Sequence, residues 1–251
     1  KFLFSIGRGH TKRIAHTQPR RVAVQTLASR IAREMGPDLC EVVGFHVRFL
    51  RKVSYRTRIK IVTDGLLLAE IKTDPLLNSY DTIIIDEVHE RNLNIDLLLG
   101  FLKKILLKRN DLKVFITSAT LNTKIFSEYF FEAPIIQIDG KTFPVSISYQ
   151  PVNVDINKVS TNLSPLIFNQ IIKCRKNDQG LKKHSRGILV FLPGERTILD
   201  VSRYLRRFDF EDLEVLPIYG RLSSNEQQKV MTPPKKGIQR VVLATNIAET
   251  S

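Results

Sequence analysis

Short apolar, β-branched runs alternate along the first half of the chain with longer amphipathic stretches. This alternation is typical of βαβ units around a parallel sheet, because strands buried on both faces are apolar throughout and helices carry a single apolar face. We predict strands at residues 13–17, 45–49, 59–63, 82–86, 114–117 and 135–138, and helices at 22–35, 66–71, 95–107 and 123–131.

A second series with the same rhythm begins after Phe143-Pro144. It predicts a connecting strand at 145–149, core strands at 188–192, 213–218 and 241–244, helices at 156–174, 195–207 and 225–231, and exposed loops at 175–186 and 233–237. A chain of 251 residues exceeds the usual size of one domain. We therefore expect an α/β protein of two tandem domains with mainly parallel sheets, at residues 1–143 and 144–251.

Composition narrows the class of protein and of partner. Hydrophobic residues make up 43% and charged residues 25%, which are values for a soluble globular protein. The formal net charge of +14 favours a polyanionic partner, with a solvated basic surface as the alternative. Two distant cysteines, Cys40 and Cys174, indicate neither a disulfide nor a zinc site. No apolar run is long enough to span a bilayer, and we expect a cytoplasmic protein.

The clearest chemical motif is the pair of carboxylates in Asp86-Glu87-Val88-His89, which follows an Ile-rich predicted strand. Ligands of open parallel sheets bind beyond the carboxyl ends of the strands. Asp86 and Glu87 are candidate magnesium ligands there, and Glu87 could orient a water for attack on a phosphate. His89 could couple this site to a second lobe. The alternative is that the acids cap the next segment and His89 is a surface histidine.

Two further motifs follow predicted strands. Ser118-Ala119-Thr120 places hydroxyls beside the acidic strand, where Ser118 and Thr120 could bond the acidic cluster, although the same residues could cap a helix. Thr17-Gln18-Pro19-Arg20-Arg21 opens a predicted helix. Arginines at the positive end of a helix are unfavourable unless an anion lies there, so Thr17, Arg20 and Arg21 are candidate contacts for a nucleic-acid phosphate. The alternative is a solvated basic turn.

Residues 51–65 supply more candidate contacts to nucleic acid. Thr63-Asp64-Gly65 joins a strand to a helix, and Thr63 and the amides of the Gly65 turn could bind a backbone phosphate. The preceding basic, hairpin-like loop carries Tyr55 and Arg56, a combination suited to a single strand.

Four segments resemble, in order, motifs Ia, Ib, II and III of the DEAH-box RNA helicases: residues 17–21, 63–67, 86–91 and 118–120. The sequence around 86–94 resembles the HrpA-like branch of that family. Residues 191–194, 218–222 and 244–251 resemble motif IV, an RNA-contacting segment and motif V. The resemblance implies two RecA-like domains, ATP or another NTP with Mg²⁺ in a cleft, and RNA across both lobes. It also implies nucleotide contacts from Arg30, Met231 and Asn246, with Met231 where the family usually has phenylalanine, and RNA contacts from Gly220, Arg221 and Thr245.

By the resemblance, two elements of the family are missing from the sequence. None of its segments matches the phosphate-binding pattern GxxxxGK[ST]. By the resemblance, that loop would precede Lys1 and an arginine-rich motif VI would follow Ser251, so we expect a fragment with negligible NTP hydrolysis. The alternatives are an RNA-binding remnant without catalysis and a related DNA translocase. Asp86, Glu87, Ser118 and Thr120 favour the helicase, because a pure RNA binder does not need them.

Overall fold

The computed structural model describes residues 1–119, 123–138, 140, 144–150, 159–177 and 187–248. The chain divides into two compact units, Lys1–Lys141 and Thr142–Ser251, each built on its own sheet. The fold is α/β with mainly parallel strands, as the sequence predicted.

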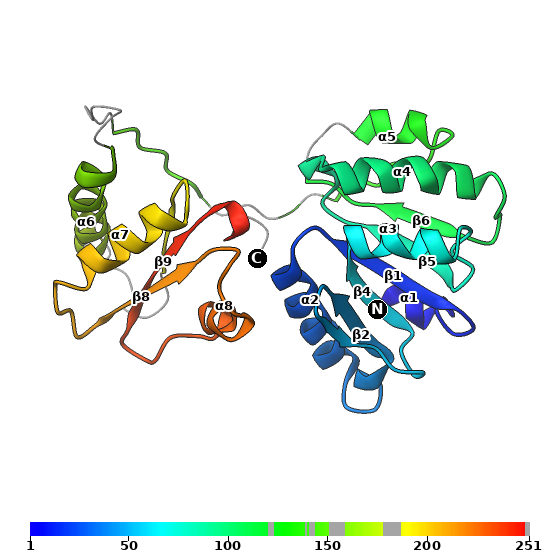
Figure 1. Cartoon of the computed structure of the whole chain (residues 1–251), viewed down its shortest axis with the longest axis horizontal. Coiled ribbons are helices and arrows are strands. Elements are labelled where there is room, and N and C mark those ends of the chain that lie inside the picture. Colours follow the sequence, from blue (N-terminus) through cyan, green and yellow to red (C-terminus); the bar gives the residue numbers. More distant parts are fainter. Residues whose placement is uncertain (120–122, 139, 141–143, 151–158, 178–186, 249–251) are drawn as a thin grey trace. The chain divides into compact units, whose positions relative to one another are not determined.

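Unit 1 contains a six-stranded sheet in the order β3-β2-β4-β1-β5-β6, in which only the β2–β3 pair is antiparallel (Figure 1). Its strands are β1 (Arg13–Gln18), β2 (Val43–Val47), β3 (Leu50–Lys52), β4 (Ile59–Thr63), β5 (Tyr80–Ile85) and β6 (Lys113–Ile116). Its helices are α1 (Phe2–Ser5), α2 (Arg21–Met35), α3 (Asp64–Thr73), α4 (Leu93–Leu106) and α5 (Thr123–Tyr129), with short 3-10 turns η1 (Cys40–Val42) and η2 (Val88–Glu90).

Alternate residues of the strands of unit 1 supply two cores, one on each face of the sheet. Ile14 and Ile61 pack with Val24 and Ala28 of α2 on one face. Their neighbours Ala15 and Val62 instead pack with α3 and α4 on the other face. Because successive strand side chains point to opposite faces, strands covered on both sides must be apolar at nearly every position. This requirement explains why these strands were recognisable in the sequence.

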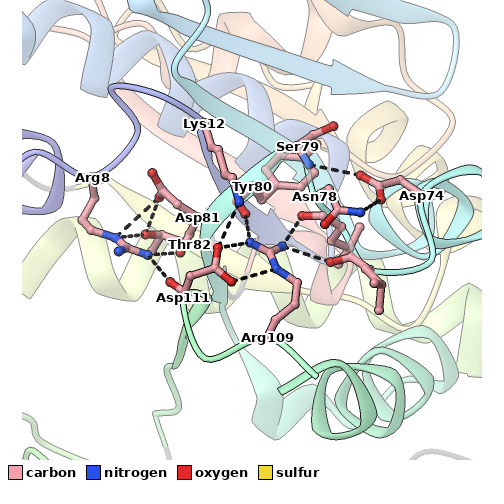
Figure 2. Close-up of polar contacts among 12 residues, drawn as sticks. Arg8, Lys12, Asp74, Asn78, Ser79, Tyr80, Asp81, Thr82, Arg109 and Asp111 are labelled. Atoms are coloured by element: carbon pink, nitrogen blue, oxygen red, sulfur yellow. Dashed lines mark hydrogen bonds and ion pairs between the residues drawn. The ribbon is translucent and has the colours of Figure 1, made fainter. Parts of the chain in front are cut away.

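At the amino ends of β1 and β5, arginines bind the sheet to the loops around it (Figure 2). Arg109 is 6% exposed and donates to the carbonyl oxygens of Leu76, Leu77 and Tyr80, at 3.0, 2.6 and 2.9 Å. Asp111 pairs with Arg109 and also accepts from Lys12 at 2.9 Å. A second arginine, Arg8, contacts the side chains and backbone of residues 81 and 82. This edge of the sheet is therefore structural.

Unit 2 has a three-stranded parallel sheet in the order β7-β9-β8. Its elements are α6 (Val159–Asn177), β7 (Ile188–Phe191), α7 (Glu195–Leu205), β8 (Leu213–Ile218), α8 (Ser224–Met231), β9 (Gln239–Ala244) and the 3-10 turn η5 (Asn246–Ala248). Its core joins Ile171 of α6 and Ile198, Val201 and Leu205 of α7 to the strands.

Two of the predicted strands are absent from the structure. Residues 135–138 and 145–149 form no ladder, and Ile136, Ile138, Val145 and Tyr149 are 81–89% exposed. An alternating apolar pattern is not enough for a strand, which also needs a neighbour to accept and donate its backbone hydrogen bonds.

Some predicted boundaries were also wrong, and one helix was missed. The strand predicted at 45–49 ends at Val47, because Phe49 has a φ of 71° and turns the chain into the unpredicted β3. The loop predicted at 175–186 begins later, since α6 continues to Asn177 and the remainder lies outside the described residues. Helix α1 was not predicted; its residues Leu3 and Phe4 pack against the α2 side of the sheet.

Candidate nucleotide and nucleic-acid site

Four of the sequence motifs meet at the carboxyl edge of the sheet in unit 1. In the parallel register, Thr17 lies beside Ile85, Gln18 beside Thr63, and Ile85 beside Ile116. The segments that leave these strands therefore emerge together. Asp86 and Glu87 follow β5, Ser118 follows β6, and the Thr63-Asp64-Gly65 turn follows β4. Thr120, the second hydroxyl predicted after β6, lies outside the described residues.

Asp86 accepts hydrogen bonds on both of its carboxylate oxygens. Its Oδ2 accepts from His16 Nε2 at 3.1 Å and from Gln18 Nε2 at 2.5 Å, and its Oδ1 accepts from the Thr117 hydroxyl and from the Glu87 amide at 3.0 Å. Burial acts to raise the pKa of Asp86, but the bonds from His16 and Thr117 outweigh burial and lower the pKa below its ordinary value. Asp86 is therefore held as a carboxylate.

Sequence reasoning missed all three of these side-chain donors to Asp86. His16 and Gln18 lie on the same face of β1, two residues apart, and Thr117 directly precedes the predicted Ser118. Their position in the sequence shows only that they end strands. Which strands neighbour the acidic one is decided by the order of the sheet, so no local pattern could have identified them.

Glu87 and His89 form a second group that reaches the segment after β6. His89 Nε2 lies 3.3 Å from Glu87 Oε2, and His89 Nδ1 accepts from the Ala119 amide at 3.3 Å. Since Nδ1 accepts, the tautomer assigned by this network carries its proton on Nε2. Burial and then the charge of Asp86 raise the pKa of Glu87. The structure thus joins the predicted motifs II and III through His89.

The two arginines at the start of α2 lie in different environments. Arg20 Nη2 lies 3.2 Å from Glu90 Oε1, and the two side chains are 13% and 21% exposed. Arg21 is exposed. The Glu90 carboxylate is therefore the anion beside Arg20, and it comes from within the chain. Arg21 is the more accessible of the two arginines to an external phosphate.

The Thr63-Asp64-Gly65 turn is packed closely against the start of α4. Asp64 is 2% exposed, and its Oδ2 accepts from Asn92 Nδ2 at 3.4 Å. A Cβ at Gly65 would lie 3.4 Å from Asn94 Nδ2. This is an ordinary van der Waals distance to the end of a flexible side chain, so steric crowding does not require glycine at this position.

The predicted contacts Tyr55 and Arg56 lie at the opposite edge of the sheet, in the loop that leads from β3 back to the amino end of β4. Arg56 bonds Tyr55 Oη at 3.0 Å and Glu41 at 2.5 Å. The tip of the hairpin, at the carboxyl end of β2, instead presents Arg48 over the ring of Phe49, which is 87% exposed. Sequence reasoning did not select this second pair.

Arg30, the predicted base contact, is exposed on α2 and bonds Glu34 Oε1 at 2.9 Å. It follows Arg21 by nine residues, about 14 Å along the helix axis away from the carboxyl edge. The structure therefore does not gather Arg30 with Asp86 and Glu87.

In unit 2, the residues predicted to contact RNA lie at the carboxyl ends of β8 and β9. The Thr245 amide donates to Ile218 O at 3.2 Å, which brings Thr245 beside the segment containing Gly220 and Arg221. Asn246 is exposed in the following turn. Met231 ends α8 at the other edge, where its neighbours Val230 and Thr232 accept from Arg240. Unit 2 therefore does not gather Met231 with Asn246.

The described ranges contain neither a metal-binding cluster nor a membrane-spanning helix. No group of three or more His, Cys, Asp or Glu side chains there could hold a metal ion. Among these same residues, no helix is long and apolar enough to cross a membrane. Cys40 and Cys174 are both exposed free thiols.

Comparisons with known proteins show which proteins this chain resembles in sequence and fold. Residues 168–251 match the family model of the helicase conserved C-terminal domain. The whole chain is 45% identical to the ATP-dependent RNA helicase HrpA of Escherichia coli K12 over 251 residues, or 19% of that protein, and 38% identical to the human probable ATP-dependent RNA helicase DHX34, covering 22% of it. The crystal structure of the E. coli DEAH/RHA helicase HrpB superposes with a TM-score of 0.76 at 34% identity, covering 95% of this chain and 29% of HrpB.

The α/β fold with its mainly parallel sheets resembles the RecA-like domains of helicases. In sequence and structure the chain is similar to the DEAH-box RNA helicases, the HrpA proteins among them, as the sequence predicted. It spans about a fifth of the length of the HrpA proteins of E. coli and Haemophilus influenzae.

Proposed function

We propose that the chain is part of the motor of an ATP-dependent RNA helicase, which couples nucleotide hydrolysis to movement along RNA. The observation that carries this proposal is the convergence of the segments at 17–21, 63–67, 86–91 and 117–119 on one edge of the sheet, with His89 bonded to Glu87 and Ala119. Relatives along the whole chain bear the name ATP-dependent RNA helicase, which supports the same reading.

Asp86 and Glu87 fit a magnesium ion of the kind that accompanies nucleotides. Mg²⁺ usually takes one or two protein carboxylates and completes its shell with water and phosphate oxygens, so a cluster of three ligands is not needed. Because both oxygens of Asp86 already accept two bonds each, we expect Asp86 to hold the ion through water. The ion would neutralise phosphate charge, while Glu87, with its raised pKa, would orient the attacking water.

The residues of this chain fit ATP only in part. The acidic pair is present, but no segment matches the glycine-rich loop that cradles the phosphates. We assign Arg30 and Met231 to the base and Asn246 to the nucleotide as proposals, together with roles for Ser118 and Thr120 in sensing the nucleotide state. The assignments of Arg30, Met231 and Asn246 rest on the family resemblance alone, because the structure separates Arg30 from the acidic pair and Met231 from Asn246.

RNA is the proposed partner of the carboxyl edge. Arg21 is exposed at the amino end of α2, where the helix dipole favours a phosphate, and the Thr63 turn and the Arg48–Phe49 tip lie at the same edge. Thr17 and Arg20, by contrast, are largely covered and would support this surface from beneath. In unit 2, Gly220, Arg221 and Thr245 are the corresponding candidates. Tyr55 and Arg56 would serve only an RNA that also reaches the amino edge.

A matched pair of arginines on α2 tests the RNA surface. Arg21 and Arg33 are both exposed on the same helix, but Arg33 lies in its last turn, at the end away from the carboxyl edge. We expect Arg21→Ala to weaken binding of a fluorescent 12-nucleotide oligouridylate and to reduce the magnitude of the salt slope by about 0.7, the value for one phosphate on a single strand. Fluorescence anisotropy at several salt concentrations measures both. Equal losses for Arg21→Ala and Arg33→Ala would contradict the proposed surface.

A second candidate function is RNA binding without catalysis, favoured by the lack of a GxxxxGK[ST] segment in these 251 residues. The coding sequence on either side of this segment distinguishes the two. An in-frame phosphate-binding loop upstream supports the motor, and stop codons there support the binding module.

A further inference from the structure

The segment that carries the acidic motif is a sharp turn with unusual backbone at both ends. Glu87 has a φ of 56° and Arg91 a φ of 46°, on either side of η2. Left-handed backbone is uncommon in residues other than glycine and costs free energy unless its surroundings hold it. The contacts that hold this turn therefore control the position of Glu87 and His89.

Asn92 holds the end of this turn through two hydrogen bonds. Its Oδ1 accepts from the Ile95 amide at 3.0 Å, which caps α4, and its Nδ2 donates to Asp64 Oδ2 at 3.4 Å. The partner Asp64 is 2% exposed. Burial raises the pKa of Asp64, while hydrogen bonding to Thr17 and Asn92 opposes that rise. Because Asp64 is buried, losing its contact to Asn92 would be costly.

A second contact ties the same turn to the other RNA-facing segment. Glu90, inside the turn, pairs with Arg20 at 3.2 Å, next to exposed Arg21. Asp64 directly precedes Gly65 in the turn proposed to bind a phosphate. Two of the proposed RNA segments of unit 1, at Arg20-Arg21 and at Thr63-Asp64-Gly65, are thus bonded, side chain to side chain, to the turn that carries Glu87 and His89.

We propose that Asp64 and Asn92 are positioning residues, through which RNA bound at the carboxyl edge changes the backbone of the 86–92 turn. RNA that shifts the Thr63-Asp64-Gly65 turn moves the acceptor of Asn92, and Asn92 fixes the end of the acidic turn. By linkage, a change in the acidic turn alters RNA affinity by the same factor. This inference rests on the proposed RNA-binding function.

The test uses hydrogen exchange of the 251-residue chain with and without a 12-nucleotide oligouridylate. Asn92→Asp keeps a good helix cap but replaces the donor to Asp64 with a second carboxylate. Asn78→Asp is the matched control, since Asn78 Nδ2 also donates to an aspartate, Asp74, at 3.2 Å, at the amino edge (Figure 2). The double variant Asp64→Asn/Asn92→Asp exchanges donor and acceptor, so it restores the contact with the charge unchanged.

We expect RNA to slow exchange of amides 86–91 in the natural chain, in Asn78→Asp and in the double variant, by a factor between about 2 and 30. The RNA effect should be lost in Asn92→Asp, while amides 63–67 remain protected. A purely structural bond would change exchange without RNA but not the response to RNA. Far-UV circular dichroism checks folding, and Asn92→Ser replaces Asn92→Asp if that variant unfolds, because serine caps α4 but is too short to reach Asp64.

Two results would overturn the inference. In the first, anisotropy shows RNA binding, but RNA does not slow exchange at 86–91, or slows it equally in Asn92→Asp. This result overturns the coupling and leaves the proposed RNA binding intact. Absence of oligouridylate binding overturns the proposed function and the coupling together.

Discussion

Single side chains at the carboxyl edge have charge states that their partners determine. Asp86 and Glu87 are consecutive acids, yet hydrogen bonds lower the pKa of the first, while burial and its neighbour's charge raise the pKa of the second. Neighbouring acids with pKa values displaced in opposite directions are suited to different tasks. Here Asp86 is suited to holding positive charge, and Glu87 to orienting water.

Replacing Asp86 with asparagine should destabilise unit 1. Asparagine keeps one acceptor oxygen and replaces the other with an NH₂ group. That group faces two donors, either His16 and Gln18 or Thr117 and the Glu87 amide, so we expect a loss of about 1–3 kcal/mol in the free energy of unfolding at neutral pH. Asp96→Asn is the control, since Asp96 pairs with Arg91 on the surface and should cost less than about 1 kcal/mol. Urea titrations, with hydrogen exchange of the core amides of unit 1 as the readout, measure both changes in the free energy of unfolding.

The loss in the free energy of unfolding caused by Asp86→Asn should decrease at acid pH. The folded pKa of Asp86 is lowered, so its stabilising charge is fully present above the unfolded pKa of about 3.9 and is lost as pH falls through the folded pKa. The difference between the natural chain and Asp86→Asn should therefore shrink below about pH 4. A difference independent of pH would contradict a role for the carboxylate charge.

At the scale of elements, the two ends of the strands in unit 1 differ: the candidate functional residues lie at the carboxyl ends, and structural arginine contacts lie at the amino ends. Turns that carry Asp86, Thr63 and Ser118 leave the carboxyl ends of the strands. At the amino ends, Arg109 and Arg8 bond backbone carbonyl oxygens (Figure 2). Parallel strands produce this division, since every crossover returns the chain to the amino edge before the next strand begins.

Arg109→Met should weaken the amino edge without altering the carboxyl edge. The substitution leaves the carbonyl oxygens of Leu76, Leu77 and Tyr80 without their buried donor, and we expect a loss of about 3–5 kcal/mol in the free energy of unfolding. Arg91→Met removes only an exposed pair and should cost less than about 1 kcal/mol. Urea unfolding gives both values, and a small loss for Arg109→Met would mean that water replaces the guanidinium.

At the scale of the whole molecule, two units with separate cores carry a net charge of +14. Such a charge draws a polyanion by long-range attraction, and it makes affinity strongly dependent on salt. We therefore expect this chain to bind RNA, because it carries the positive charge and exposed arginines that a polyanion needs. We do not expect it to hydrolyse ATP, because these 251 residues contain no phosphate-binding loop.

A phosphate-release assay tests whether this chain lacks ATP hydrolysis. With ATP, Mg²⁺ and polyuridylate, we expect the 251-residue chain to release phosphate at the rate of its Glu87→Gln variant, which lacks the carboxylate proposed to orient water. The variant serves as the blank for contaminating activity. RNA-stimulated release that Glu87→Gln abolishes would show that the chain completes a nucleotide site by other residues.

Much of the fold and the family could be predicted from sequence, and particular residues show why. Ile83 and Ile85 are buried on one face of the sheet while Ile84 packs on the other, so the whole of β5 is visible as an apolar run. The motif residues are consecutive and carry their own identity. Residues 135–138 have the same apolar character but form no strand, because a strand also depends on a distant partner.

The sequence by itself determined the α/β class, most of the helices and strands, the basic charge and the helicase motifs, because periodicity and short motifs are local properties of the chain. Only the tertiary structure decided that Asp86 is held by His16, Gln18 and Thr117, that Arg20 is paired with Glu90, and that Tyr55 and Arg56 lie across the sheet from the acidic turn. These facts depend on strand order and register, which long-range pairing sets and no local pattern contains.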